Sequence, residues 1–264
     1  MLEIKNLTKV FNAGTVNEKV ALRNLNLTLE DGDFVTVIGG NGAGKSTALN
    51  AIAGTWRPDS GSIVVDGFDI TAMPEHKRAR FLGRVFQDPM MGTAADMEIE
   101  ENLALARRRG MRRGLRWGVT AAERAEYREA LGRLELGLED RLTTKVGLLS
   151  GGQRQALTLL MATLVRPRVL LLDEHTAALD PKTAEKVLTL TDKIVHENGL
   201  TTMMVTHNMR DAIRYGNRLI MFKDGGIVLD IRGEEKKKLT VEALLAAFSA
   251  ASGTEFAHDS ALLS

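Results

Sequence analysis

A glycine-rich segment with one lysine constrains the fold of this chain more than any other feature. It reads Gly39-Gly40-Asn41-Gly42-Ala43-Gly44-Lys45-Ser46, and it joins an apolar run ending at Ile38 to a predicted helix up to about Ala53. Glycines let backbone N–H groups turn inward around phosphate oxygens, and the N-terminus of a following helix adds positive potential. Lys45 would supply charge to the β- and γ-phosphates, and Ser46 a hydroxyl to Mg²⁺. A chance glycine-rich turn is the alternative, but the flanking strand and helix favour a phosphate-binding loop.

Two adjacent carboxylates follow an apolar strand later in the chain. Residues 169–172 are all Val or Leu, which predicts a strand buried on both faces, and Asp173 and Glu174 come directly after it. Two carboxylates are costly to desolvate unless they serve a metal or a reaction. Asp173 fits a Mg²⁺ ligand, directly or through water, and Glu174 fits a base for an attacking water. The alternative, solvated acids at an ordinary strand end, is weakened by the phosphate loop upstream.

Composition and charge exclude several classes of protein. Of 264 residues, 44% are hydrophobic and 26% charged, and the formal net charge is +1. These values are ordinary for a soluble globular protein and give no global bias towards nucleic acid or membrane. The sequence contains no cysteine, which excludes a disulfide framework, thiol catalysis and cysteine-type zinc sites. No stretch approaches the roughly 20 apolar residues that span a bilayer, so we expect a soluble protein whose membrane role would need a partner chain.

The order of predicted elements indicates an α/β fold. Strands are expected within residues 1–33, and strands alternate with helices from residue 169 onwards, which implies a parallel sheet covered on both faces. Residues 89–160 are rich in Ala, Glu, Arg and Leu at helical spacing, and we interpret them as an inserted, mostly helical subdomain. We expect the folded domain to cover residues 1–251, and residues 252–264 to form a flexible tail.

A third motif decides the class. Leu149-Ser150-Gly151-Gly152-Gln153 lies upstream of Asp173 and precedes a predicted helix from Arg154 to Leu164. With its flanking elements it resembles the signature motif of the ATP-binding cassette family. Other residues match further motifs in the family's order, namely Phe11 for the aromatic that stacks on adenine, Gln87 for the Q-loop, Ala178-Leu179-Asp180 for the D-loop and His207 for the switch histidine. The resemblance covers about residues 1–235.

The resemblance implies a P-loop NTPase core with an N-terminal antiparallel β subdomain and an inserted helical subdomain. Such a protein binds ATP with Mg²⁺ and hydrolyses it between two copies, one giving Lys45, Ser46 and Asp173 and the other giving Ser150, Gly152 and Gln153. The catalytic residues would be Glu174, His207 and Lys45, and the Mg²⁺ site would comprise Ser46, Gln87 and Asp173. Nucleotide contacts are implied for Phe11, Gly39, Gly40, Asn41, Gly42, Ala43, Gly44, Lys45, Ser46, Thr47, Gln87, Ser150, Gly151, Gly152, Gln153 and Asp180.

Some of these residues also allow a plainer interpretation. Asp180 could cap the following helix, His207 could begin a helix without any chemistry, and Phe11 could belong to the core. Gln87 could be a simple loop amide. The family commonly has proline after the catalytic glutamate, where this chain has His175, and we interpret His175 as structural.

The resemblance also implies partners and a location. We expect a homodimer with two membrane permease subunits, possibly an extracytoplasmic solute-binding protein, and no nucleic acid, at the cytoplasmic face of the inner membrane. The segment 173–184 is similar to ATPases of bacterial uptake systems, for which amino acids are among the suggested cargo. The alternatives are an efflux or lipoprotein-release ATPase, and a soluble non-transport cassette ATPase. The latter usually has tandem cassettes or a long coiled-coil insert, neither of which is seen in this sequence.

A basic run remains outside these motifs. It comprises Arg107, Arg108, Arg109, Arg112, Arg113 and Arg116, and Trp117 follows it. It is a solvated helical face, a contact with lipid headgroups or an acidic permease loop, or a nucleic-acid contact. The absence of interleaved aromatics and the near-zero net charge weaken the nucleic-acid alternative.

Overall fold

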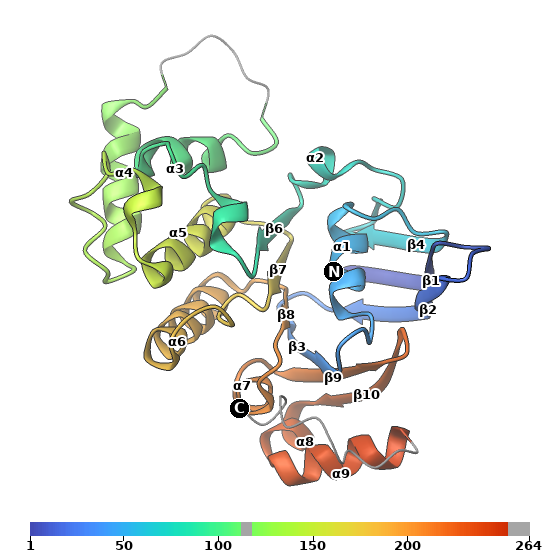
Figure 1. Cartoon of the computed structure of the whole chain (residues 1–264). Coiled ribbons are helices and arrows are strands. Elements are labelled where there is room, and N and C mark those ends of the chain that lie inside the picture. Colours follow the sequence, from blue (N-terminus) through green and yellow to red (C-terminus); the bar gives the residue numbers. More distant parts are fainter. Residues whose placement is uncertain (112–117, 253–264) are drawn as a thin grey trace.

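A six-stranded sheet forms the centre of the computed structural model, which describes residues 1–111 and 118–252 (Figure 1). The strand order is β10-β9-β3-β8-β7-β6. The bounds are β3 (Phe34–Gly39), β6 (Leu82–Val85), β7 (Val169–Asp173), β8 (Thr202–Val205), β9 (Arg218–Lys223) and β10 (Gly226–Arg232). All neighbours from β9 to β6 are parallel, and β3 and β8 are buried along their whole length. Because parallel strands end at the same edge, the loops after β3, β7 and β8 meet there.

The edge strand β10 departs from the expected parallel arrangement. It pairs antiparallel with β9, with Gly226 opposite Lys223. Asp224 and Gly225 connect the two strands with φ angles of 49° and 79°. A two-residue hairpin needs positive φ at both positions, and Asp-Gly pairs are favoured because they tolerate it. The Gly225 N–H also donates to the carbonyl of Ala43 at 3.0 Å, so this hairpin supports the phosphate loop.

A second sheet, antiparallel and four-stranded, contains the N-terminal part of the chain in the order β2-β1-β4-β5. The bounds are β1 (Leu2–Phe11), β2 (Lys19–Leu29), β4 (Ser60–Val65) and β5 (Phe68–Asp69). The helix α1 (Lys45–Ala53) contributes Leu49 and Ile52 to an apolar core that includes Ile4 of this sheet and Val37 of the central one. The helix after the phosphate loop is therefore held by both sheets.

Helical elements between β6 and β7 form a separate layer beside the central sheet (Figure 1). They are α3 (Ile99–Arg107), α4 (Ala121–Gly132), α5 (Gly151–Thr163) and the 3-10 turns η1 (Pro89–Gly92) and η2 (Val146–Leu148). Leu103, Tyr127 and Leu157 are among their buried core residues. These elements lie where the helical subdomain was expected, and its boundaries near residues 89 and 160 stay a prediction.

The described members of the arginine run have structural partners. Arg107 pairs with Glu126 and Arg108 with Glu123, both on α4, while Arg109 donates to the carbonyls of Ala162 and Val165. Of these three residues, Arg107 ends α3, Arg108 is its C-cap and Arg109 follows the helix, so they do not form one solvated helical face. Arg112, Arg113, Arg116 and Trp117 lie outside the described residues.

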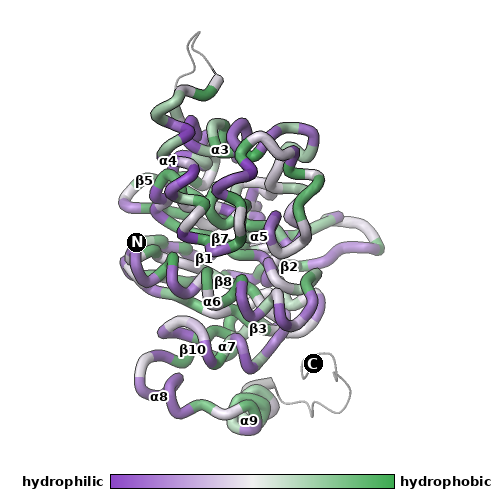
Figure 2. Tube along the Cα trace, turned by 90° about the vertical axis from the view of Figure 1, so that its left-hand side faces the viewer, coloured by the Kyte–Doolittle hydropathy of each residue, from purple (hydrophilic) through white to green (hydrophobic). Residues whose placement is uncertain are grey.

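The remaining helices cover the faces and the far edge of the sheet. They are α2 (Glu75–Arg78), α6 (Pro181–Asn198), α7 (Met209–Arg214), α8 (Gly233–Lys237) and α9 (Val241–Ser252). The apolar helix α9 is coloured mainly on the hydrophobic side in Figure 2 and buries Leu244 and Phe248 beside Ile38. Ser252, expected to begin the tail, ends α9, and residues 253–264 of the predicted tail lie outside the described part of the chain.

Among the helices of residues 1–111 and 118–252, none has the length and apolar character needed to cross a membrane.

A buried lysine attaches α8 to the central sheet. Lys236 is only 2% exposed, and its ammonium donates to the carbonyls of Tyr215, Gly216 and Arg218 and to the Thr36 hydroxyl. Burial lowers the pKa of Lys236 to about 8.

Replacing Lys236→Met should lower the free energy of unfolding at pH 7 by about 1–3 kcal/mol, because buried carbonyls lose their donor. Lys237→Met on the same helix is the control, since Lys237 is exposed and pairs with Glu234 at the surface. Because the folded pKa of Lys236, about 8, lies below the ordinary 10.5, the unfolded chain binds more protons between these values. The wild type should therefore gain stability as pH rises through that window. Urea denaturation measures each effect, and equal stability of wild type and Lys236→Met at pH 7 would contradict this role.

Candidate functional site

The phosphate loop joins β3 to α1 in a conformation that requires glycine at two positions. Gly39 has a φ of 149°, and a Cβ there would lie 2.4 Å from the carbonyl oxygen of Phe222. Gly44 has a φ of 106°, and a Cβ there would lie 2.6 Å from the carbonyl oxygen of Ala21. Gly44 is also the N-cap of α1 and provides no side-chain acceptor, so the first backbone N–H groups of α1 are open to an anion.

The side chain of Lys45 lies beneath this loop. It is 5% exposed, and its ammonium donates to the carbonyls of Gly39 at 2.5 Å and Gly40 at 3.1 Å. Burial lowers the pKa of Lys45, while the charges of Glu174 and Asp173 oppose that shift. A cation is therefore held at the base of a backbone cradle, next to two carboxylates.

The two carboxylates are at the adjacent edge of the sheet, as predicted. Burial raises the pKa of Asp173, and the nearby Arg84 guanidinium, with Nη2 at 3.7 Å from Oδ2, counters that rise. Glu174 has a φ of 47°, in the left-handed region that non-glycine residues rarely adopt. Its amide donates to the carbonyl of Val205 at 3.1 Å, which ties the end of β7 to β8.

His207 meets Glu174 although they lie far apart in sequence. The distance between His207 Nε2 and Glu174 Oε1 is 2.6 Å. Asn208 caps α7, accepting hydrogen bonds from the amides of Arg210 and Asp211, so His207 precedes the helix and is not part of its first turn. This contact favours the chemical interpretation of His207 over that of an idle helix residue.

A cavity of about 180 Å³ brings the predicted nucleotide residues together. Its lining residues are Phe11, Lys19, Ala21, Asn41, Gly42, Ala43, Gly44, Lys45, Ser46, Thr47, Glu174 and His207. Lys19 was missed from the sequence because it belongs to no motif. It reaches the cavity because β2 pairs with β1 and places Lys19 opposite Phe11.

Phe11 lies on the wall of this cavity and not in the core. Its ring is partly buried and meets the edge of Trp56 at a centroid distance of 5.2 Å and an interplanar angle of 82°. Lys9 Nζ lies 5.5 Å from the centre of the ring. An aromatic ring at this position offers a face to a flat base.

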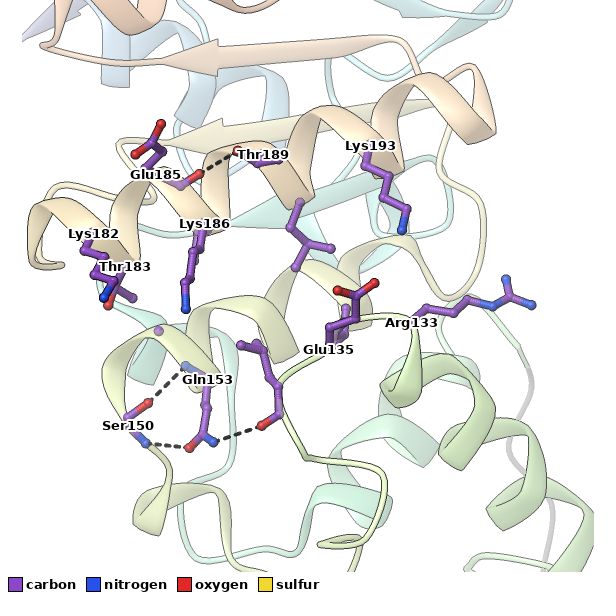
Figure 3. Close-up of a pocket in the computed structure, with 15 residues that line it drawn as sticks. Arg133, Glu135, Ser150, Gln153, Lys182, Thr183, Glu185, Lys186, Thr189 and Lys193 are labelled. Carbon is purple, nitrogen blue, oxygen red and sulfur yellow. Dashed lines mark hydrogen bonds between the residues drawn. The ribbon is translucent and has the colours of Figure 1, made fainter.

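The signature residues form a second site at the start of α5. Ser150 is the N-cap, with Ser150 Oγ accepting from the Gln153 amide at 3.3 Å and Gln153 Oε1 accepting from the Ser150 amide at 3.2 Å. Gln153 also donates to the carbonyl of Leu136 at 3.2 Å, as Figure 3 shows. A Cβ on Gly152 would lie 2.2 Å from Thr183 Cγ2, so glycine permits close contact between α5 and α6. A Cβ on Gly151 would lie 3.2 Å from Cδ2 of Leu179, in the loop before α6.

This second site lines a different cavity. Ser150, Gly152 and Gln153 face Lys182, Lys186 and Lys193 of α6 across a space of about 760 Å³ (Figure 3). No residue of the phosphate loop lines this cavity in the described part of the chain. One chain therefore does not bring its own signature residues to its own phosphate loop.

The other predicted residues have mixed outcomes. Asp180 caps α6, accepting from the Thr183 amide at 3.1 Å, as its plainer interpretation required. Gln87 is exposed after β6 and lines neither cavity, and among the described residues it has no hydrogen-bond partner.

His175 is buried, its Nε2 lies 3.0 Å from Thr191 Oγ1, and burial lowers its pKa to about 4. A neutral, packed His175 agrees with a structural role.

Comparison with known proteins gives the family. The family model described as ABC transporter matches residues 22–177. The chain is 48% identical to a tyrosine transport ATP-binding protein of Clostridioides difficile, over 94% of this chain and 98% of the relative. It is 37% identical to a thiamine import ATP-binding protein of Salmonella choleraesuis, over 79% of this chain and 84% of the relative.

Solved structures agree with this result. A dimeric ATP-binding cassette, bound to ADP and phosphate in a post-hydrolysis state, matches with a TM-score of 0.75 and 32% identity, over 88% of this chain and 98% of that one. The cassette fold expected from the motifs, with its antiparallel β subdomain, is confirmed. The chain belongs to the ABC transporter family, as a subunit that binds and hydrolyses ATP.

Proposed function

We propose that this subunit energises the import of a small organic solute, such as an amino acid, through separate membrane permeases. The observation that carries the proposal is the 48% identity to a tyrosine transport ATP-binding protein over 94% of the chain. Relatives named for import of thiamine, methionine and spermidine or putrescine support import over efflux or lipoprotein release. The chain covers 61% of the methionine relative and 60% of a spermidine/putrescine relative, and 84% of the thiamine one.

Two copies would share each ATP. Since Ser150, Gly152 and Gln153 line a cavity apart from the phosphate loop, a nucleotide on Lys45 would gain these contacts only from a second copy. A related cassette solved as a dimer supports this arrangement. A two-fold axis would then create two equivalent sites.

At each site, different residues at this edge of the sheet would bind the phosphates, the base, the metal ion and the attacking water. The backbone of the phosphate loop and the Lys45 ammonium would hold the phosphates, and Phe11 would stack on the base. Ser46 and Asp173 offer hard oxygen donors that suit Mg²⁺, whose other ligands would be phosphate oxygens and water. Glu174 would polarise the attacking water, with His207 orienting its carboxylate.

The permease would dock where the helical layer meets the central sheet. Next to Gln87, η1 exposes Met90 and Met91, which are 41% and 70% exposed, and Leu148 of η2 is 73% exposed. Exposed apolar groups of this kind mark interaction sites, and methionine adapts to irregular partners. Arg154 of α5 contacts Met90 Sδ and the carbonyls of Gly147 and Leu149, so it joins this surface to the signature helix. Binding there would hold the subunit at the cytoplasmic face of the membrane.

Hydrolysis should depend on the Glu174 carboxylate. Glu174→Gln keeps the size and the polar contacts of the side chain but is a poor base, so we expect ATP binding to persist while turnover falls by at least about a hundredfold. Phosphate release and the mass of the complex with Mg-ATP measure both effects, with a trapped dimer expected. Near-normal turnover would remove Glu174 from the mechanism.

Mixing two inactive variants tests the shared site. In a mixed dimer of Lys45→Ala and Ser150→Arg chains, both defects fall in one site and the other site is intact. Half of the dimers in an equal mixture are mixed, so about a quarter of wild-type activity should return. Activity no greater than the sum of the two separate variants would show that each chain works alone.

The docking surface predicts a selective loss of the membrane complex. Met91→Glu should abolish co-purification with the permease partner on co-expression, because it places a charge in an apolar contact. Val16→Glu, at a fully exposed apolar position on the turn between β1 and β2, is the matched control and should co-purify normally. ATP binding by the isolated subunit should be unchanged in both variants. Normal co-purification of Met91→Glu would place the permease elsewhere or argue for the non-transport alternative.

A further inference from the structure

Arg84 is a charged side chain on β6 that connects three parts of the nucleotide site. It lies three residues before Gln87, and its side chain is 14% exposed. Nη2 donates to Asn50 Oδ1 at 2.7 Å and Nη1 to Thr55 Oγ1 at 3.2 Å. Asn50 belongs to α1 and Thr55 follows that helix. Arg84 is therefore hydrogen-bonded to the C-terminal end of α1, the helix that begins at the phosphate loop.

The same guanidinium faces Asp173. Nη2 lies 3.7 Å from Asp173 Oδ2, and the Asp173 side chain is 16% exposed. The Phe86 ring covers the guanidinium with its centre 4.4 Å away, and Nε is buried with no hydrogen-bond partner in the described part of the chain. Burying a guanidinium that is only partly satisfied is costly, so its charge must be balanced nearby. Asp173 makes the larger contribution to this balance, and Glu75 adds a smaller one.

Both carboxylates at this edge of the sheet have a cation nearby before any ligand arrives, and Lys19 on the cavity wall adds a further positive charge. Asp173 and Glu174 give two negative charges, and Lys45 and Arg84 give two positive ones. A divalent cation alone would therefore meet carboxylates that are already neutralised, at close range and away from bulk water. Nucleotide phosphates add negative charge and would shift this balance in favour of the metal.

We propose that Arg84 is a positioning residue that holds the Asp173 carboxylate against the end of α1 and keeps divalent cations out of the site until nucleotide phosphates arrive. The proposal rests on the assignment of Asp173 to the metal site under the proposed function. Arg84 lies in β6, which ends at Val85, two residues before Gln87, so the segment that leads to Gln87 starts from the strand that carries this contact.

Binding of Mn²⁺ without nucleotide, followed by electron paramagnetic resonance, tests this role. Arg84→Gln removes the charge, and its amide can still bond to Asn50 or Thr55. Its Mn²⁺ affinity should exceed that of the wild type at least about fivefold. Arg84→Lys keeps the charge and should restore exclusion. Arg168→Gln, which removes a charge beside Asp66 outside both cavities, should bind Mn²⁺ as the wild type does. Arg84→Met gives a second neutral variant if the glutamine variant does not fold.

Two outcomes would overturn the proposal. One is a folded neutral variant that binds Mn²⁺ no more tightly than the wild type. The other is a gain that persists after Asp173→Asn is added, because the two residues would then act independently. The metal assignment itself is tested separately by Asp173→Asn in the wild-type background with ATP present. Unchanged Mn²⁺ binding there would overturn the assignment, whereas a gain in Arg84→Gln that needs Asp173 would still support the role of Arg84.

Discussion

The parallel pairing of β3, β8 and β7 is the constraint on which the nucleotide site depends. It brings the ends of three strands to one edge, so that Lys45, Glu174 and His207 meet although they lie far apart in sequence. The backbone at this edge has little freedom, because Gly39 and Gly44 lie against the carbonyls of Phe222 and Ala21. Catalysis of phosphoryl transfer relies mainly on positioning and charge, and a rigid edge supplies both.

A second constraint separates the signature from this edge. Ser150 and Gln153 are held in a capping box at the start of α5, and Gly152 packs on α6. These contacts place the capped start of α5 beside a cavity distinct from the phosphate loop (Figure 3). Under the proposed function, a nucleotide would contact both helix starts only when two chains come together, which would link occupancy to assembly. The exposed methionines of η1 lie next to Gln87, where a change between the two layers would reach a docked partner.

The parts of this site that depend on local backbone chemistry could be predicted from the sequence. Residues that reach the site through the pairing of strands could not. The phosphate loop and α1 lie where the glycines and Lys45 placed them, and Asp180 caps α6 as its residue type suggested. Lys19 and Arg84 belong to no motif and reach the site only through the register of β2 on β1 and of β6 on β7. A strand at residues 227–230 was expected, but the antiparallel pairing of β10 was missed although Asp224-Gly225 is a hairpin signal, because an alternating strand–helix order suggested one parallel sheet. The helix α9 was also missed, because its apolar side chains are explained by packing against residues of β3, β9, β10 and α7 that are distant in sequence.

The central claim is that the signature of one copy closes over the phosphate loop of another, and a distance between two chains tests it most directly. The sequence has no cysteine, so single cysteines can carry spin labels without background. One chain would be labelled at Lys19, on the rim of the phosphate cavity, and its partner at Leu148, exposed just before the signature. In the Glu174→Gln background, double electron–electron resonance should reveal a short inter-chain distance on addition of Mg-ATP that is absent without nucleotide. No inter-chain coupling with Mg-ATP, in a sample shown to bind ATP, would contradict the account.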